Sequence, residues 1–273
     1  MTDTPPSDAT FASDWLALRE PVDHRSRAAE LAGCLARAVA DRSWSTAVDL
    51  GCGTGSNLRY LAPRLPGIRK WLVVDHDRAH LDALAAPQDT ELVRIRGDLA
   101  SAGLDAVDDA DVVTASALLD LVSATWVDAL VERCGRRGAA ALFSLSYDGR
   151  VDWSHPDPED PAVRAAVNRH QERDKGLGAA LGPDGGTVVA RAFEGAGYVV
   201  SQVTTPWRLE GPADLPLVRQ LVAGWVEAAC ETDPNSAPRF EAWGVRRLDD
   251  FRVGRTRLTV GHVDVLALPP ERS

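Results

Sequence analysis

The chain has 273 residues, of which 45% are hydrophobic, and its formal net charge at pH 7 is −10. This length and composition fit one large α/β domain or a domain with a modest second unit, and they argue against wholesale disorder. The acidic charge disfavours broad binding to nucleic acid, which needs a basic face. No apolar run approaches the roughly 18 residues of a membrane helix. The four cysteines lack the spacing of a zinc site or a disulfide framework, which indicates a reducing, cytoplasmic setting.

In chain order, the first expected element is a helical segment over 11–40, where apolar residues recur at three- and four-residue spacing. Strand-like and helix-like segments then alternate, which is the pattern of a parallel sheet covered by helices on both faces. The expected strands are 46–50, 70–75, 92–95, 111–116, 139–147, 198–205 and 258–268. The expected helices between them are 57–65, 78–85, 124–133 and 187–195.

Two long segments interrupt this alternation. Residues 148–186 contain Trp153, a proline cluster, a charged helix and a glycine-rich exit. Residues 211–252 carry an apolar stripe from Val218 to Ala229 at helical spacing. We therefore expect both segments to lie outside the common sheet.

The first strand breaks into a glycine-rich turn, "VDLGCGTGSN", in which Gly51, Gly53 and Gly55 let the backbone approach a ligand. The dinucleotide fingerprint GxGxxG is not met, because Ser56 stands where its third glycine would be, and no GK[ST] follows for a phosphate loop. Asp49 lies inside the buried strand, where a carboxylate is costly unless something pairs with it or binds it. We therefore expect either a cationic ligand group or a side-chain network at Asp49.

Two further carboxylates end the next two strands. Asp75 closes the second strand, where its oxygens can accept from both hydroxyls of a ribose. Asp98 follows the third strand after Gly97, where it can accept from an adenine amino group. The structural alternatives are a helix N-cap for Asp75, with Asp77 the better cap candidate, and a solvated turn for Asp98. Together the three carboxylates beside the glycine turn indicate a ligand that has adenosine and no phosphate.

These motifs resemble those of the class I S-adenosylmethionine-dependent methyltransferases. "VDLGCGTGSN" is similar to the first motif of that family, "WLVVDHD" to its second-strand acid, "RIRGDLA" to its third-strand acid and "DVVTASALLDLVS" to its fourth strand and loop. The resemblance covers about 44–147 by motif and 187–268 only by topology. It implies an α/β fold: a seven-stranded Rossmann-like sheet with helices on both faces, helical cap insertions and an antiparallel seventh strand.

The resemblance also implies S-adenosylmethionine as cofactor, S-adenosylhomocysteine as product, and no metal. The glycines approach the amino-acid part of the cofactor, Asp49 anchors its ammonium end, Asp75 binds the ribose and Asp98 meets the adenine. Cys52 has the alternative of being only a small residue in a tight turn. The expected cofactor residues are Asp49, Gly51, Cys52, Gly53, Gly55, Asn57, Asp75, His76, Asp98, Leu99 and Ser116.

The expected organisation is a single methyltransferase domain over 1–273. Its parts are an N-terminal helical cap at 11–40, a cofactor-binding core at 41–147, acceptor-pocket insertions at 148–186 and 211–252, and sheet completion at 187–210 and 253–269.

The candidate catalytic residues are His170 and Tyr147. His170 and Asp174 have the i,i+4 spacing that would orient an imidazole as a base, and Tyr147 stands at the end of the fifth strand. The alternatives are a solvated helix face with ordinary charge pairs and a plain strand end.

The candidate substrate residues are Arg19, Asp120 and Trp153. Arg19 can clamp a carboxylate on cofactor or substrate, or form an ion pair with Glu20 or Asp23. Asp120 can face the acceptor or cap the next helix. Trp153 can stack on the acceptor or pack in the core.

Methyl transfer from a sulfonium is an in-line displacement that mainly requires the reactants to be held in position. Enzymes that methylate amino groups in nucleic-acid bases or in glutamine often carry [DN]PP[YF] after the fourth strand, whereas this chain has Thr114-Ala115-Ser116-Ala117-Leu118, which argues against those substrates. We therefore predict a small-molecule acceptor attacked at oxygen, no nucleic-acid or membrane partner, and a monomer or homodimer. The alternative is a non-catalytic or non-methylating S-adenosylmethionine-binding protein of the same fold. Ser56 and Asp49 disfavour a nicotinamide oxidoreductase.

Overall fold

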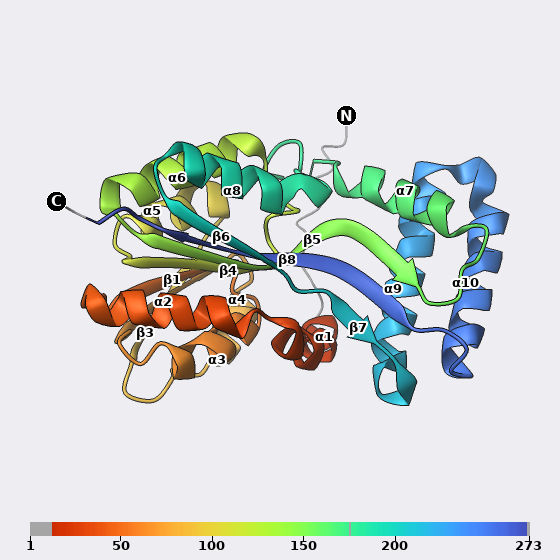
Figure 1. Ribbon diagram of the computed structural model, residues 1–273, viewed down its shortest axis with the longest axis horizontal. Coiled ribbons are helices and arrows are strands. Elements are labelled where there is room, and N and C mark those ends of the chain that lie inside the picture. Colours follow the sequence, from red (N-terminus) through yellow and green to blue (C-terminus); the bar gives the residue numbers. More distant parts are fainter. Residues whose placement is uncertain (1–12, 175, 272–273) are drawn as a thin grey trace.

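A mixed sheet forms the centre of the computed structural model, which describes residues 13–174 and 176–271 (Figure 1). Its strand order is β3-β2-β1-β4-β5-β8-β6, with β7 paired to β8. Strands β1 to β5 are parallel, and β8 is antiparallel to β5, β6 and β7. The strands are β1 (Thr46–Leu50), β2 (Lys70–Asp75), β3 (Glu91–Arg96), β4 (Val112–Ser116), β5 (Ala140–Trp153), β6 (Val199–Thr204), β7 (Trp207–Leu209) and β8 (Leu258–Leu268).

The described part of the sheet has eight strands where seven were expected. The additional strand is β7, which pairs with the first residues of β8. It forms because β5 and β8 continue as a long antiparallel ribbon beyond the other strands, and this ribbon leaves an edge at Leu258–Val260 that can accept another strand. For the same reason β5 ends at Trp153 and not at Tyr147, where the sequence predicted its end.

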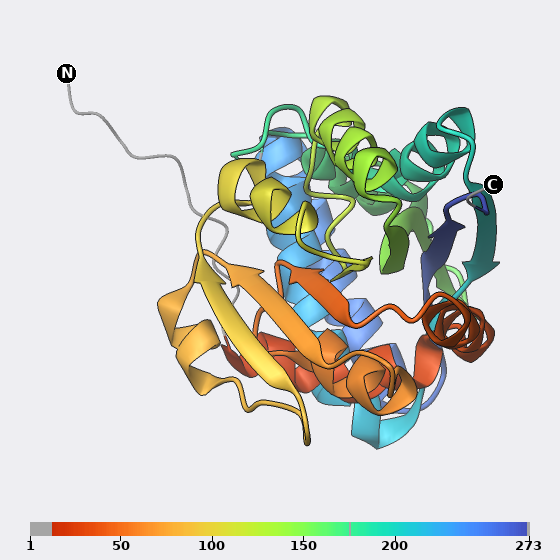
Figure 2. The same cartoon turned by 90° about the vertical axis from the view of Figure 1, so that its left-hand side faces the viewer.

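Helices cover both faces of the sheet, which confirms the predicted α/β fold class (Figures 1 and 2). One face is covered by α5 (Leu104–Val107), α6 (Ala124–Arg137) and α8 (Gly185–Gly195). The other face is covered by α2 (Ala29–Asp41), α3 (Ser56–Leu61) and α4 (Arg78–Ala83). The helix expected over 57–65 ends as α-helix at Leu61 and continues as a 3-10 turn, because Pro63 has no N–H to donate.

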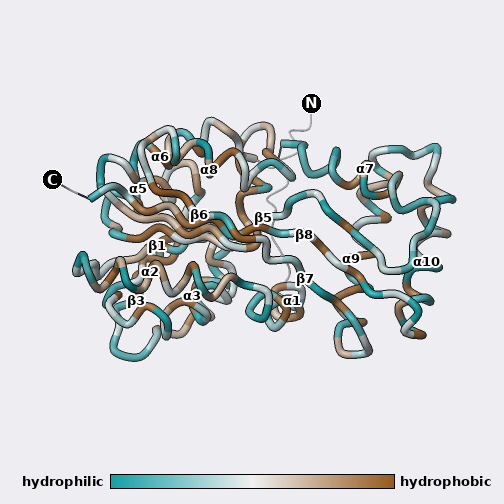
Figure 3. Tube along the Cα trace, viewed as in Figure 1, coloured by the Kyte–Doolittle hydropathy of each residue, from teal (hydrophilic) through white to brown (hydrophobic). Residues whose placement is uncertain are grey.

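Apolar residues follow this layering along the central strands (Figure 3). In β2, Trp71 and Val73 belong to the core on the α2 side, whereas Leu72 and Val74 belong to the core on the α6 side. Because both faces are covered, the strand is a continuous apolar run without polar alternation.

The remaining long helices gather beyond one end of the central sheet, around the ribbon of β5 and β8 (Figure 1). They are α1 (Ser13–Ser26), α7 (Asp160–Gln171), α9 (Gly211–Thr232) and α10 (Ala237–Arg252). Shorter helical turns are Ala62–Arg64, Leu99–Gly103, Gly182–Asp184 and Pro234–Ser236. Of the helical segment expected over 11–40, residues 11 and 12 lie outside the described residues, and the rest forms α1 and most of α2.

Asp264, a buried carboxylate on β8, fixes the position of α1. Its Oδ2 accepts from the backbone N–H of Ala28, the residue before α2, over 3.0 Å. Its Oδ1 accepts from the Leu145 N–H over 2.7 Å and from the Thr205 hydroxyl over 2.9 Å. Burial raises the pKa of Asp264. One carboxylate thus joins the turn between α1 and α2 to β5 and to the chain after β6.

Candidate functional site

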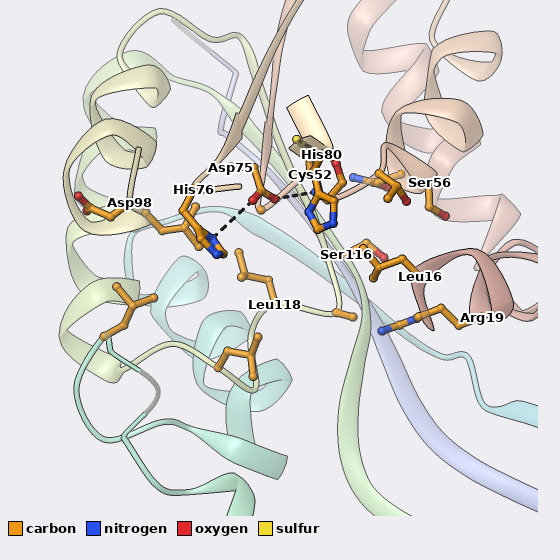
Figure 4. Close-up of a pocket in the computed structure, with 18 of the residues that line it drawn as sticks. Leu16, Arg19, Cys52, Ser56, Asp75, His76, His80, Asp98, Ser116 and Leu118 are labelled. Atoms are coloured by element: carbon orange, nitrogen blue, oxygen red, sulfur yellow. Dashed lines mark hydrogen bonds and ion pairs between the residues drawn. The ribbon is translucent and has the colours of Figure 1, made fainter. Parts of the chain in front are cut away.

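A cavity of about 310 Å³ opens where the parallel strands β1 to β4 end, with α1 on one side (Figure 4). Open α/β sheets bind ligands at the carboxyl ends of their strands, at the point where the strand order reverses, which here lies between β1 and β4. Every expected cofactor residue except Asp49 and Gly55 lines this cavity. The sequence motifs therefore converge on one place in the fold.

The glycine-rich turn after β1 forms the floor of the cavity. Gly51, Gly53 and Gly55 have φ angles of 64°, 50° and 83°, in the left-handed region that favours glycine. The turn is fastened to β2, because Cys52 N–H donates to the carbonyl of Val74 over 3.0 Å. Its backbone conformation is therefore set by the neighbouring strand.

Asp75 lies at the end of β2, between His76 and His80 in Figure 4. Its Oδ2 accepts from Gly53 N–H over 2.8 Å, and His76 Nδ1 lies 3.5 Å from Oδ1. The side chain is 6% exposed. Asp75 does not cap α4, because Asp77 occupies that position and accepts from Ala79 N–H over 2.7 Å.

Asp49 lies directly beneath the turn, fully buried within β1. Its Oδ1 accepts from the Asn57 amide over 2.5 Å and from the Thr114 hydroxyl over 2.9 Å. Its Oδ2 is buried and has no hydrogen-bond partner among the described residues. Burial raises the pKa of Asp49 to about 6, against the opposing effect of these hydrogen bonds and of Arg27.

Arg27 supports this network from the turn between α1 and α2. Its guanidinium donates to Asn57 Oδ1 and to the Ser144 hydroxyl, each over 2.6 Å, and stacks 4.3 Å from the Tyr60 ring centroid. Because Arg27 occupies the amide oxygen of Asn57, the amide nitrogen is directed at Asp49. Burial lowers the pKa of Arg27, which is 8% exposed.

Asp98 lines the cavity and is exposed. Its Oδ1 accepts from Ser101 N–H and its Oδ2 from the Ser101 hydroxyl, both over 2.7 Å. The Ser101 hydroxyl and backbone therefore lower the pKa of Asp98. Asp98 thus caps the helical turn that begins at Leu99, and in Figure 4 its carboxylate points away from the other labelled lining residues.

The structure does not bring the two candidate catalytic residues to the cavity. His170 Nε2 lies 3.0 Å from Glu231 of α9, while the expected partner, Asp174, accepts from Gly176 and Gly178 N–H instead. The Tyr147 hydroxyl donates to Asn168 Oδ1 over 2.8 Å, and burial raises the pKa of Tyr147. Tyr147 is thus engaged by α7, and His170 by α9.

Of the candidate substrate residues, only Arg19 lines the cavity. It also forms the expected ion pair with Asp23, over 2.8 Å. Trp153 packs edge-on against Trp243 of α10, with ring centroids 6.3 Å apart, because β5 carries it into the apolar cluster around the ribbon of β5 and β8. Asp120 lies outside the cavity, and its backbone carbonyl accepts from Gly182 N–H over 3.2 Å.

Sequence reasoning missed a further set of lining residues: Leu16, Asp23, Thr54, Ser56, His80, Gly97, Ala117, Leu118, Leu121, Gly176 and Leu177. The available signal was the spacing of Leu16, Arg19 and Asp23, which places them on one face of α1. Among the described residues, no cluster of three or more histidine, cysteine or acidic side chains is arranged to hold a metal ion. No helix among these residues has the length and apolarity needed to cross a membrane.

Comparison with solved structures identifies the fold. A cyclopropane-fatty-acyl-phospholipid synthase-like protein from Lactobacillus casei is similar over 92% of this chain and 99% of its own, with 13% identity and a TM-score of 0.51. A methyltransferase from Geobacter sulfurreducens, solved with S-adenosylhomocysteine, is similar over 95% of this chain and 99% of its own (18% identity, TM-score 0.45). The chain has the class I S-adenosylmethionine-dependent methyltransferase fold.

An O-methyltransferase family protein from Burkholderia thailandensis is also similar to part of the chain, over 62% of this chain and 52% of its own, with 18% identity and a TM-score of 0.38. No family model and no curated protein sequence matches the chain. The likeness to these solved structures is one of fold.

Proposed function

We propose that this protein transfers a methyl group from S-adenosylmethionine to a small-molecule acceptor. The observation that carries the proposal is the cavity at the strand ends of a class I methyltransferase fold, where the glycine turn and Asp75 meet. S-adenosylmethionine, when bound, supplies an electrophilic methyl group on its sulfonium.

The residues present fit that cofactor. Asp49 Oδ2 is a buried carboxylate oxygen without a partner among the described residues. Asp49 does not itself line the cavity, but its charge beneath the turn favours an ammonium group bound against that turn. Asp75 is held rigidly by Gly53 N–H, and its oxygens retain lone pairs for two ribose hydroxyls. Leu99 and His76 supply flat and apolar surface beside Asp98 for the base.

The chain's own contribution to the reaction would be positioning. Ser116 ends β4, and Ala117 and Leu118 follow it in the cavity wall, to which Leu121 and Leu177 add apolar surface. An apolar wall of this kind can hold an acceptor oxygen in line with the methyl donor, and such positioning can account for roughly 7–11 kcal/mol of a displacement barrier. We propose oxygen as the attacked atom because the β4 loop lacks the motif typical of amino-group methylation. The acidic net charge favours a small molecule over a nucleic acid as the acceptor.

The first test is calorimetric titration with S-adenosylmethionine and S-adenosylhomocysteine. We expect micromolar binding by the natural protein and at least tenfold weaker binding by Asp75→Ala. Asp82→Ala is the matched control, because Asp82 is an exposed carboxylate on α4 outside the cavity. Absence of binding by the folded natural protein would overturn the cofactor assignment.

The second test is formation of S-adenosylhomocysteine with phenols, carboxylic acids and amines as acceptors. We expect turnover with an oxygen acceptor. Turnover confined to amines would contradict methylation at oxygen. Tight binding without turnover on any acceptor class would favour the alternative of a non-methylating S-adenosylmethionine-binding protein.

A further inference from the structure

Helix α1 presents an arginine to the cavity that the cofactor motifs do not use. Leu16, Arg19 and Asp23 line the cavity from successive turns of this helix. Figure 4 shows the Arg19 side chain reaching from α1 toward the other lining residues. Arg19 is the only lysine or arginine among the described residues that line the cavity.

The guanidinium of Arg19 is held in place along one edge. Its Nε donates to Asp23 Oδ2 over 2.8 Å and its Nη2 to Asp23 Oδ1 over 3.3 Å. The group also lies 5.1 Å from the centroid of the Trp207 ring, within range of a cation–π interaction. Trp207 Nε1 in turn donates to Asp23 Oδ1 over 3.1 Å, so both Asp23 oxygens accept hydrogen bonds from this scaffold. Arg19 is therefore a rigid residue on a scaffold formed by α1 and β7.

The other edge of the guanidinium has no partner. Among the described residues, nothing accepts a hydrogen bond from Nη1 of Arg19, although the side chain is only 14% exposed. Because Arg19 lines the cavity and Nη1 is not fully buried, a ligand carboxylate can reach this edge and satisfy two guanidinium donors at once. The nearby wall is apolar, with Leu16, Leu118 and Leu121.

We propose that Arg19 is the carboxylate-binding residue of this cavity. Its free edge receives the carboxylate of a bound ligand in a two-point hydrogen-bonded pair, while Asp23 and Trp207 keep the guanidinium in the required plane. The inference rests on the proposed function for the identity of the ligand and on the contacts of Arg19 for its chemistry.

The carboxylate has two possible sources: the acceptor, and the amino-acid part of the cofactor. Trp207 and its neighbour His262, whose ring centroids are 4.8 Å apart, lie on β7 and β8. These strands are on the far side of β4 and β5 from Asp75 and Asp98, so Arg19 lies at the opposite end of the cavity from the adenosine motifs. Both sources would place a carboxylate at that end.

The test compares Arg19→Met and Arg19→Lys with the natural protein. Arg19→Lys keeps the charge and the pair with Asp23 but loses the two-point fork, and it guards against a folding defect in Arg19→Met. Arg25→Met is the matched control, because Arg25 is also on α1 but pairs with Asp214 outside the cavity. Each protein is titrated with S-adenosylhomocysteine and with its decarboxylated analogue. Each is then saturated with S-adenosylhomocysteine and titrated with phenylacetate and with the neutral phenylacetamide.

If the cofactor supplies the carboxylate, Arg19→Met weakens S-adenosylhomocysteine binding at least tenfold and leaves binding of the decarboxylated analogue unchanged. If the acceptor supplies it, S-adenosylhomocysteine binding stays within twofold, and an at least tenfold preference for phenylacetate over phenylacetamide is lost in Arg19→Met. In both cases the affinity of Arg19→Lys lies between those of the natural protein and Arg19→Met, and the affinity of Arg25→Met equals that of the natural protein. Independence of all these affinities from Arg19 overturns the inference. If the natural protein fails to bind S-adenosylhomocysteine, the proposed function fails, and titration of the ligand-free protein with phenylacetate still decides the role of Arg19.

Discussion

The side-chain amide of Asn57 donates to Oδ1 of Asp49 over 2.5 Å, while Oδ2 of the same carboxylate is buried without a partner in the described part of the chain. Asn57 belongs to α3, on the far side of the glycine turn from β1. The contact therefore closes the turn from below and leaves one oxygen unsatisfied. Burying one carboxylate oxygen without a partner lowers the stability of the ligand-free protein at a place where a ligand can restore that stability.

Replacing Asp49 by Asn should stabilise the ligand-free protein at pH 8 and weaken cofactor binding. Burial raises the pKa of Asp49 to about 6 in the folded chain, from an ordinary value of 3.8. Because the folded pKa is raised, the ionised carboxylate opposes folding by an amount that grows from about pH 4 to pH 6 and then stays constant, roughly 1–3 kcal/mol. Urea unfolding at pH 8 measures the gain, which should shrink at pH 4. A less stable variant at pH 8 would show that the network tolerates only the carboxylate.

Under the proposed function, S-adenosylhomocysteine affinity should fall as the pH drops below about 6. The charge of ionised Asp49 beneath the turn stabilises the ligand ammonium, and protonation removes that charge, so the affinity should fall by up to tenfold per pH unit. Calorimetry between pH 5 and pH 8 gives the profile. Asp49→Asn should bind weakly with a flat profile over the same range, and an equally steep profile in that variant would assign the titration to another group.

The strand ends were predictable from the sequence because parallel strands buried on both faces are short apolar runs that end in polar residues. Asp75, Asp98 and the glycine turn follow such runs, so their convergence at one edge follows from local pattern and sheet geometry. The extra strand β7 was not predictable in this way. Its three residues pair with β8 only because the ribbon of β5 and β8 runs past the central sheet.

The position of α1 and the partner of His170 depend on contacts that are distant in sequence. Asp23 accepts a hydrogen bond from Trp207 Nε1, which is 184 residues away in the sequence, and no local spacing of residues predicts such a contact. Helical spacing favoured Asp174 as the partner of His170, but α9 presents Glu231 to it and Asp174 folds back onto a glycine turn. Local pattern thus located the cofactor motifs and Arg19 but not Leu16, Asp23 or Leu177, which also line the cavity.

Replacing Arg27 by Met should destabilise the protein by about 2–4 kcal/mol. It should also raise the pH below which the affinity for S-adenosylhomocysteine falls. The variant removes the donors to Asn57 and Ser144 and leaves Asp49 without its nearest opposing charge, which raises the pKa of Asp49 further. Urea unfolding and calorimetric pH profiles measure the two effects. Arg64→Met is the control, because Arg64 stacks on the same Tyr60 ring, 3.8 Å from its centroid, without joining the network. If the affinity of Arg27→Met falls at the same pH as that of the natural protein, Arg27 does not control the ionisation of Asp49.

Replacing Gly55 by Ala should destabilise the protein by about 2–4 kcal/mol, although Gly55 does not line the cavity. Its φ of 83° is strained for any residue with a Cβ, and a Cβ there would overlap the Leu84 side chain of the segment after α4. Gly195→Ala is the control at the end of α8, where a Cβ meets nothing within 4 Å and helix propensity predicts a gain of about 0.4–1 kcal/mol. Thermal unfolding of both variants, with and without saturating S-adenosylhomocysteine, checks the pair. Because the clash with Leu84 distorts the turn that forms the cavity floor, the ligand should stabilise Gly55→Ala less than Gly195→Ala. Equal stabilisation by the ligand would mean that the turn recovers its shape by moving Leu84 alone.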